Sequence, residues 1–516
     1  MAQWNIQNQD YLNQERSLFE VNNIATKDGQ PVSVDNPFPV SLGSSSITIN
    51  GDISIPGIVT VTSTPENPIH SHLVEVGTSS TLTVPYLPVG ISTLLNTVSI
   101  GTTGQVSINL NNSPVSTTNP FPVTATFGNQ TDSNRLKVSP FQTVFFNTFQ
   151  YGKETDVWDE RIVGVGTATW NQYSSNVVMQ VGVTTGSKVI RQTKNVMRYI
   201  PGRGSTLAFA VRLDNPQVGI RRRFGLFDDN NGAYFEDNGG TYSYVIRTTT
   251  TGITTEIRIG REGWNGDKFD GNGPSGVIAD PIKQQMISIA YEWYGAGTVN
   301  FDWLMGGKTV RSHSFINSNT NNFVWCSTPF LPIRLEIENI TGVAGTHYLY
   351  QGSNSLIQEG EPEKLGALVS QSNTITGTTM TLADTFYPII SLRLKPTALQ
   401  AVLLLRSLQA VTNDNTNVYW KLLENATLTG ANWINHANPD SFAQYDISAT
   451  SYSNGRDILS GFTISGGSSL TDIDRLADLQ LGRSGIGTIS DIYTLVCASP
   501  NTNKKALAVL NWIEQR

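Results

Sequence analysis

The sequence is poor in charged residues, which make up only 15% of its 516 positions. Globular domains usually carry about 25%. Ser, Thr, Asn and Gly take the place of the missing charges, while aromatic residues still reach 9%. Disordered chains combine high net charge with few aromatics. This composition therefore indicates a folded, all-β protein with many short strands and polar turns.

Basic residues are neither abundant nor clustered. The formal net charge is −7, and the run Arg221-Arg222-Arg223 is the nearest approach to a basic patch. Recognition of nucleic-acid phosphates needs clustered Lys and Arg, so we do not expect a nucleic acid as partner. We interpret the arginine run as a solvent-exposed strand end or a subunit contact.

Cysteines and long apolar stretches are also scarce. The two cysteines, Cys326 and Cys497, are both flanked by apolar residues, and a disulfide scaffold would need more of them. We therefore predict buried free thiols. The N-terminus lacks the pattern of a signal peptide, and no stretch is apolar enough to span a bilayer. We expect a protein that is made in a cytoplasm and matures without membrane insertion.

The familiar sequence patterns of active sites are missing. The chain has no H-E-x-x-H, paired C-x-x-C, G-x-S-x-G or phosphate-binding glycine loop. We expect no cofactor and no enzymatic activity. Glu236 and Asp237 form a carboxylate pair of the kind that glycoside hydrolysis uses, but adjacent residues on a strand point to opposite faces.

Two histidines form one candidate metal site. His70 and His72 lie in the stretch "HSH", and residues two apart on a strand share a face. Three chains around an axis would bring together six imidazoles, enough for an octahedral metal, although such sites are more often built from oxygen ligands. The alternative is two surface histidines after the turn "PENP".

Two acidic loops have the oxygen-rich, glycine-bent composition that suits Ca²⁺. Neither fits the spacing of a calcium-binding loop, and Asp and Asn also dominate ordinary hairpin turns. We therefore favour structural turns. The polar residues of the two loops are Asp228, Asp229, Asn230, Glu236 and Asp237 in the first, and Asp267, Asp270 and Asn272 in the second.

Several aromatic residues lie near these polar loops and could stack on sugar rings, because an aromatic face is apolar with a polar rim. The alternative is that they fill the core; in "AYEWYG" at least half of the rings should be buried. The candidates are Tyr234, Trp264, Tyr291, Trp293 and Tyr294.

One phrase occurs twice near the N-terminus: "PVSVDNPFPVS" at residues 31–41 and "PVSTTNPFPVT" at residues 114–124. Each proline fixes its own φ and makes the preceding residue extended. The shared "NPFPV" is thus a stiff connector that holds one aromatic, Phe38 or Phe121, at a set angle. We interpret it as the start of a repeated β module.

The region that contains this repeat has no Lys or Arg between Lys27 and Arg135. Its short runs alternate between apolar and polar residues, as strands do. Such thin sheets rarely bury enough surface to be stable alone, and Lys, which often protects edge strands, is missing. We therefore expect other chains to cover these edges, with a homotrimer as the first choice.

The chain divides into five predicted parts. Residues 1–30 form an arm, 31–141 small β modules, 142–358 an antiparallel β-sandwich, 359–368 a linker and 369–516 a second sandwich, both of jelly-roll or lectin-like type. The final stretch, "KKALAVLNWIEQR", could be a helix or a strand. We favour a hairpin with "DIYTLVCASP", which precedes it by one short turn.

The N-terminal 40 residues resemble a known family. The phrase "LFEV" at Leu18–Val21, followed by "NPFPV" at Asn36–Val40, is similar to the N-terminal segment of structural proteins from T4-like tailed phages of the cyanophage kind. The resemblance implies a virion protein of the tail, baseplate, neck or fibre, assembled in the host cytoplasm and bound to other virion proteins. The predicted assembly contacts are Phe19, Val21, Phe38 and Phe121.

These observations leave three functional hypotheses. The first is an oligomeric structural component of a phage virion. The second is a lectin-like tail protein that binds a host surface glycan through residues 142–350. The third, less favoured, is a depolymerase that cleaves host polysaccharide.

Overall fold

The structure is a computed structural model that describes residues 140–361, 365–412, 414–464, 470–473 and 479–515, together with five short strands nearer the N-terminus. By its contacts the chain forms two compact units, Met1–Thr126 and Phe127–Arg516. In the first unit, β1 pairs with β2 in parallel, and β3, β4 and β5 form an antiparallel sheet. The bounds are β1 Phe19–Glu20, β2 Ile47–Thr48, β3 Val98–Ile100, β4 Val106–Leu110 and β5 Ser113–Pro114.

Several predicted sites lie outside the described residues. They include His70 and His72, the predicted metal ligands, and Val21, Phe38 and Phe121, three of the predicted assembly contacts. For Phe19, the structure describes the strand but not the side chain.

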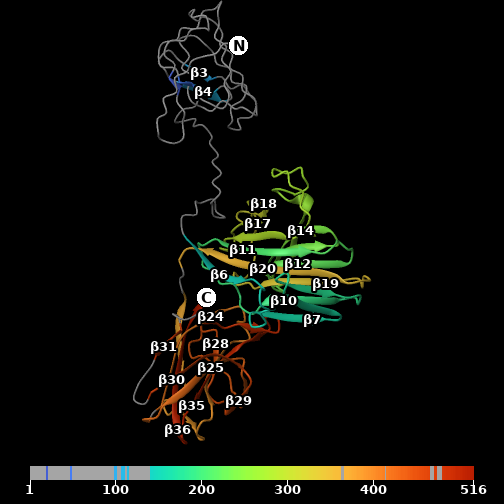
Figure 1. Ribbon diagram of the computed structural model, residues 1–516. Helices are drawn as coiled ribbons and strands as arrows, with labels where there is room; N and C mark the ends of the chain where they lie inside the picture. The colour runs from blue at the N-terminus through green and yellow to red at the C-terminus, as the bar shows by residue number, and fades with distance from the viewer. Residues whose placement is uncertain are drawn as a thin grey trace, which may run out of the picture. The chain divides into compact units, whose positions relative to one another are not determined.

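The second unit confirms the all-β prediction: it is built of antiparallel sheets (Figure 1). No helix among the described residues is long and apolar enough to cross a membrane. The first sandwich consists of a seven-stranded sheet, in the order β15-β14-β13-β12-β19-β10-β7, and an eight-stranded sheet, in the order β18-β17-β16-β11-β20-β9-β8 with β6 paired to β20. Its elements are β6 Phe141–Asn147, β7 Trp158–Val163, β8 Gly166–Asn171, β9 Asn176–Val181, β10 Ser187–Thr193, β11 Ser205–Leu213, β12 Ile220–Phe227, β13 Gly232–Asn238, β14 Thr241–Thr248, β15 Thr255–Gly260, η1 Arg261–Gly263, β16 Gln285–Tyr291, β17 Val299–Met305, β18 Lys308–Phe315, β19 Ile333–Asn339 and β20 His347–Glu359.

The core of the first sandwich lies between its two sheets. On β11, every second residue from Leu207 to Leu213 is buried, as the alternation of side chains along a strand requires. Aromatic residues from both sheets meet there; the Phe209 and Phe224 rings, for example, lie 5.6 Å apart edge to face. Each fully buried side chain of this size stabilises the fold by about 1.5–3 kcal/mol.

The second sandwich has two six-stranded sheets, and two small two-stranded sheets, β26-β29 and β33-β34, accompany them. One has the order β21-β36-β24-β31, with β22 on β36 and β32 on β24, and the other β27-β28-β23-β35-β25-β30. The strands are β21 Ala367–Ser372, β22 Thr378–Met380, β23 Tyr387–Leu394, β24 Val402–Thr412, β25 Val418–Glu424, β26 Thr427–Thr429, β27 Ile434–Asn435, β28 Ala443–Asp446, β29 Ser451–Ser453, β30 Arg456–Thr463, β31 Leu470–Asp472, β32 Leu479–Gln480, β33 Arg483–Ser484, β34 Ile489–Ser490, β35 Ile492–Ala498 and β36 Lys504–Gln515.

The predicted C-terminal hairpin is wrong. Both segments are strands, but β35 pairs with β23 and β25, whereas β36 pairs with β21, β22 and β24 in the opposite sheet. The turn between them therefore carries the chain from one sheet to the other. This placement lets β36 bury Trp512 between the sheets, where it is fully shielded from solvent.

Within the second unit, the two sandwiches are joined by apolar and polar contacts. Val196 of the first sandwich packs in one buried cluster with Val402, Leu404 and Ile513 of the second. Gln480 Nε2 donates a hydrogen bond of 2.9 Å to the carbonyl of Val196. These contacts hold the end of the seven-stranded sheet against the second sandwich.

Candidate functional site

The turn between β12 and β13 is held rigid by one carboxylate. Asp228 Oδ1 accepts the backbone N–H groups of Asn230 and Asn231, both at 2.8 Å. Asp228 Oδ2 accepts a hydrogen bond of 2.7 Å from Gln400 Nε2 of the second sandwich. The acidic loop is therefore a structural turn, as its composition predicts, and it is also a contact between the sandwiches.

Asn231, in the same turn, is held by Thr249 and Ser327. Asn231 Nδ2 donates to Thr249 Oγ1 at 3.1 Å, and Asn231 Oδ1 accepts the N–H and hydroxyl of Ser327 at 3.1 and 2.9 Å. By contrast, no hydrogen bond joins the exposed Asn230 carboxamide to another residue in the described part of the chain. The turn thus presents a free amide on a rigid backbone.

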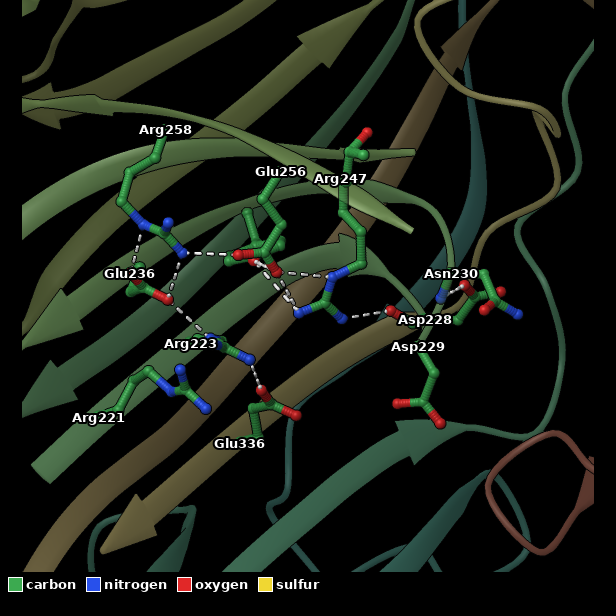
Figure 2. A network of polar contacts seen from close by, with 12 residues as sticks. Arg221, Arg223, Asp228, Asp229, Asn230, Glu236, Arg247, Glu256, Arg258 and Glu336 are labelled. Carbon is green, nitrogen blue, oxygen red and sulfur yellow. Dashed lines mark hydrogen bonds and ion pairs between the residues drawn. The ribbon is translucent and has the colours of Figure 1, made fainter. Parts of the chain in front are cut away.

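Beside this turn, the outer face of the seven-stranded sheet carries a network of charged side chains (Figure 2). The strand register creates it: Arg223 on β12 lies opposite Glu236 on β13 and Glu336 on β19. Arg223 donates to Glu236 at 2.8 Å and to Glu336 at 2.7 Å. Arg334 extends the network, with Glu336 at 3.0 Å and Asp229 at 2.8 Å.

The network continues towards the sheet edge through Glu256 on β15. Arg247, directly opposite on β14, and Arg258 each donate to Glu256 at 2.7 Å. Arg258 also donates to Glu236 at 2.8 Å. Opposite charges on neighbouring strands are therefore paired across the sheet from β19 to β15.

An apolar cluster of Phe227, Tyr234 and Val245, all fully buried, lies on the same outer face. The Arg247 guanidinium lies 5.5 Å from the Phe227 ring and 5.1 Å from the Tyr234 ring. The Arg334 guanidinium lies 5.3 Å from the Phe227 ring. Cations over ring faces are stabilised by the ring quadrupole, so the arginines both cover this cluster and bind the carboxylates.

On this face, Glu336 and Glu256 have lowered pKa values. Burial alone would raise the pKa of Glu336, but the charges of Arg334 and Arg223 outweigh it and hold the pKa at about 2. Glu256 is more exposed than Glu336; its partial burial is outweighed by hydrogen bonds from Tyr234 and Arg247, and its pKa is also about 2. Both groups are anions at neutral pH.

We expected the arginine run to be a solvent-exposed strand end or a subunit contact. Arg222 and Arg223 are instead buried within the first sandwich. Arg222 is fully buried and points between the sheets, where it donates to Asp237 at 2.6 Å and to the Tyr348 carbonyl at 2.8 Å. Arg223, on the opposite face, is 5% exposed. Carboxylates on the neighbouring strands make this burial possible, because a buried charge needs a partner.

Glu236 and Asp237, the pair considered for glycoside hydrolysis, do not share a face of the sheet. Glu236 lies in the charged network on the outer face, bound to Arg223 at 2.8 Å. Burial raises the pKa of Asp237, but this group lies on the core side of the sheet, bound to Arg222. Glu236 and Asp237 thus face opposite ways, as their adjacency predicts.

A cleft of about 640 Å³ opens next to the β12–β13 turn. Asp228 to Asn231 and Gln192 line one side, and residues 396–401 and Arg483 line the other. Apolar side chains, among them Phe330 and Phe442, also contribute. A smaller cavity of about 220 Å³ lies over the charged network and shares Asp229 with the cleft.

The other predicted site residues have structural roles. Asp267 accepts the N–H groups of Phe269 and Ser275, both at 2.7 Å, so its loop is also a turn. Asp270 accepts the N–H of Asn272 at 2.9 Å. Within the described residues, no group of three or more metal-ligating side chains is found.

The aromatic candidates for sugar stacking are mostly core residues. Tyr234, Trp264 and Tyr291 are buried, and Trp293 is half-buried with its indole N–H on the Cys326 carbonyl. Tyr294 alone of the five is exposed. Cys326 and Cys497 are free and buried, as predicted.

Sequence reasoning missed most residues of the cleft, among them Gln400 and Arg483. Gln400 reaches the site from the second sandwich, 172 residues after Asp228 in the chain. Arg483 belongs to the short pair β33–β34. No local pattern marks either residue, because only the contact between the sandwiches brings them to Asp228.

Comparison with known proteins gives no family assignment. No protein family matches the sequence, and no curated protein matches it. Solved structures with similar architecture include a Bacteroides ovatus mixed-linkage glucan GH16 protein in complex with a product (10% identity, TM-score 0.29, 41% of this chain and 99% of that chain). A second is the carbohydrate recognition domain of Emp47p (10% identity, TM-score 0.28, 43% of this chain and 97% of that chain). A third is a legume lectin-like domain from Entamoeba histolytica (10% identity, TM-score 0.27, 42% of this chain and 98% of that chain). At this identity the likeness concerns the β-sandwich fold, and any function must be argued from the residues of the cleft.

Proposed function

We propose that the chain is a non-catalytic carbohydrate-binding protein whose ligand lies in the cleft beside the β12–β13 turn. The observation that carries the proposal is the composition of this cleft. It combines amide, carboxylate and hydroxyl groups with the apolar walls of Phe330 and Phe442. Sugars present hydroxyl groups and apolar C–H faces together, so they need both kinds of contact.

The size and rigidity of the cleft support the same proposal. Its volume of about 640 Å³ lies within the range of roughly 300–1,000 Å³ that is usual for small-molecule sites. Asp228 and Asn231 are fixed by hydrogen bonds within the protein. Little conformational entropy is then lost on binding, and this favours affinity.

We assign no reaction to the cleft because the two carboxylates that line it already have partners. Asp228 accepts hydrogen bonds from Asn230, Asn231 and Gln400, and Asp229 pairs with Arg334 at 2.8 Å. Glycoside hydrolysis needs a carboxylic acid that is free to protonate the glycosidic oxygen. Incubation of the protein with polysaccharide should therefore release no reducing ends. Release of reducing ends by the wild type would contradict the non-catalytic part of the proposal.

The binding test is a glycan array with the full chain, followed by titration of the best ligands. Asn230→Ala should weaken binding about 3- to 10-fold, the value of one hydrogen bond, without lowering the melting temperature. Asn215→Ala is the matched control, because Asn215 is also exposed but lies before β12, whereas Asn230 follows it. No binding to any glycan, or equal effects of both variants, would contradict the proposal.

We also propose, from the sequence resemblance, that residues 1–30 attach this carbohydrate-binding protein to a phage particle and that it assembles as a trimer. The repeated "NPFPV" and the stretch without Lys or Arg support this proposal. Deletion of residues 1–30 should abolish incorporation into particles while leaving glycan binding intact. Normal incorporation of the deletion variant, or a monomeric full chain in sedimentation, would contradict it.

A further inference from the structure

Arg483 is a buried arginine at the wall of the cleft. It begins β33, and its backbone N–H donates to the Lys194 carbonyl of the first sandwich at 3.0 Å. The residue is only 4% exposed. Its position is therefore fixed by the contact between the two sandwiches, and its side chain contributes to the lining of the cleft.

The guanidinium of Arg483 has no partner within the described part of the chain. No carboxylate lies within ion-pairing distance, no side-chain hydrogen bond is made, and Nη2 is buried without an acceptor. The remaining buried arginines all bind carboxylates. These pairs are Arg191–Glu160, Arg222–Asp237, Arg223–Glu336, Arg247–Glu256 and Arg334–Glu336.

Leaving this cation unpaired is costly. Burial lowers the pKa of Arg483 to about 10, although the charges of Asp228 and Asp491 act in the opposite direction. Asp228 is bound to the β12–β13 turn and to Gln400. Asp491 accepts from Asn425 at 2.9 Å through Oδ1, and its Oδ2 is buried without a partner and makes no ion pair with Arg483 within the described residues. A buried cation that faces a cleft is best satisfied by an anion that enters the cleft.

The space beside Arg483 is open for such an anion. Gly487 lies next to it with φ +79°, and a Cβ at this position would be 3.5 Å from Arg483 Nη1 and 3.2 Å from Gln192 Nε2. Two N–H donors thus flank a place where a side chain is missing. The planar fork of a guanidinium matches the two oxygens of a carboxylate.

We propose that the cleft selects acidic saccharides and that Arg483 binds their anionic group, with a sugar carboxylate as the best fit and sulfate or phosphate esters as the other sources of the same charge. This inference rests on the carbohydrate-binding function proposed above and names the class of ligand. Gln192 supplies a second donor to the same group.

The test is calorimetric titration of the full chain with oligogalacturonate and with its methyl ester, which adds one methyl to each carboxyl group and removes its charge. Sulfated and phosphorylated oligosaccharides form two further arms. We expect the wild type to bind the acid about 10- to 100-fold more tightly than the ester, as a charge-assisted hydrogen bond allows. Arg483→Gln should remove this preference without weakening ester binding, and Arg483→Lys should retain part of it.

Two control variants accompany this test. Arg456→Gln removes an arginine of the same sandwich whose side chain is 53% exposed, and it should leave the preference for acid unchanged. Gly487→Ala should weaken binding of the acid more than binding of the ester, because it fills the space beside the two donors. If an Arg483 variant does not fold, the difference between the affinities of the wild type for the acid and for the ester still tests the anion site.

The outcomes separate this inference from the proposed function. Equal binding of acid and ester by the wild type would overturn the anion site and leave carbohydrate binding intact. A preference for sulfated or phosphorylated sugars that Arg483→Gln abolishes would support the site and change the best-fitting anion. If no saccharide binds but acetate, a carboxylate without a sugar, raises the melting temperature of the wild type and not of Arg483→Gln, the anion site stands and carbohydrate binding fails. If neither occurs, both are overturned, and Arg483 is better explained by rotation towards the buried, unpartnered Asp491 Oδ2.

Discussion

Arg223 and Glu336 lie directly opposite each other on β12 and β19, with 2.7 Å between Nη1 and Oε1. Their side chains are only 6% and 4% exposed. Glu336 also binds Arg334, and Arg223 also binds Glu236. Glu336 is therefore the carboxylate that connects the charged network with Arg334, which in turn pairs with Asp229 of the cleft.

Removal of this carboxylate should destabilise the first sandwich strongly. Glu336→Ala leaves two buried guanidinium groups without their shared partner, and loss of one member of a buried pair costs about 3–5 kcal/mol. We expect a correspondingly lower urea midpoint for the first sandwich, measured by near-ultraviolet circular dichroism. Glu262→Ala is the control: this side chain is 92% exposed and 3.4 Å from Lys268, so its removal should cost less than about 0.5 kcal/mol. Similar midpoints for the two variants would contradict the importance of the network.

His313 should make the stability of the first sandwich depend on pH. Burial lowers its pKa to about 4, and its Nδ1 accepts the Asn265 N–H at 3.2 Å. Between pH 6.5 and 4 the unfolded chain binds a proton that the folded chain does not, so stability falls as the pH falls, by up to about 1.4 kcal/mol per pH unit.

The measurement is the unfolding free energy of wild type and His313→Asn at several pH values from 7 to 4. Asparagine retains an acceptor but does not titrate, so the variant should lose this part of the slope. His347→Asn, at a half-buried position outside the core cluster, should keep the wild-type slope. Parallel curves for wild type and His313→Asn would show that His313 is not the titrating group.

The two cysteines should report separately on the two sandwiches. Burial raises the pKa of Cys326 to about 12 and also raises that of Cys497, and only a thiolate reacts with a disulfide reagent. At pH 8 the disulfide reagent should therefore modify neither thiol of the native protein, and it should modify both after unfolding in guanidinium. The single variants Cys326→Ser and Cys497→Ser assign each reaction to one sandwich. Rapid labelling of the native protein would contradict the buried positions.

Features of the fold that depend on neighbouring residues could be predicted from the sequence, whereas features that depend on residues far apart in the chain could not. Alternation of apolar and polar residues is local, and it correctly indicates the strands of both sandwiches. The pairing of β35 and β36 is not local: a connection as short as residues 499–503 usually joins a hairpin, but here the apolar residues of β36 lie in the opposite sheet. Trp512 and Ile513, on opposite faces of β36, are both buried, and a hairpin with β35 would not have provided the same neighbours.

Local sequence patterns did not predict the charged network either. Three consecutive arginines suggest an exposed segment, because an unpaired charge is not buried. The carboxylates that allow their burial come from β13 and β19, and Glu336 lies 113 residues after Arg223. A search for runs of alternating acids and bases on separate strands, such as "RLEIE" at Arg334–Glu338, could have provided a signal for β19. The cleft itself, formed by residues 228–231 and 396–401, could not have been found in this way.

Gly461 gives a last test of the second sandwich. It lies directly opposite Trp420 on β25, and a Cβ at this position would be 2.6 Å from the indole Cζ2. Trp420 is only 4% exposed, so its ring cannot move freely aside. Gly461→Ala should therefore lower the unfolding free energy by about 1–3 kcal/mol, the usual effect of overpacking, and tryptophan fluorescence should detect it.

Gly260 is the matched control for this substitution. It is also a strand glycine without a positive φ, but no atom lies within 4 Å of its ideal Cβ. Gly260→Ala should therefore leave stability unchanged or raise it by up to about 1 kcal/mol, because alanine restricts the unfolded chain. Since the two substitutions add the same methyl group, any difference between them measures the contact with Trp420 and the difference in backbone surroundings. Equal midpoints would mean that the β25–β30 pair tolerates a larger separation, and the indole would then not be held by its glycine neighbour.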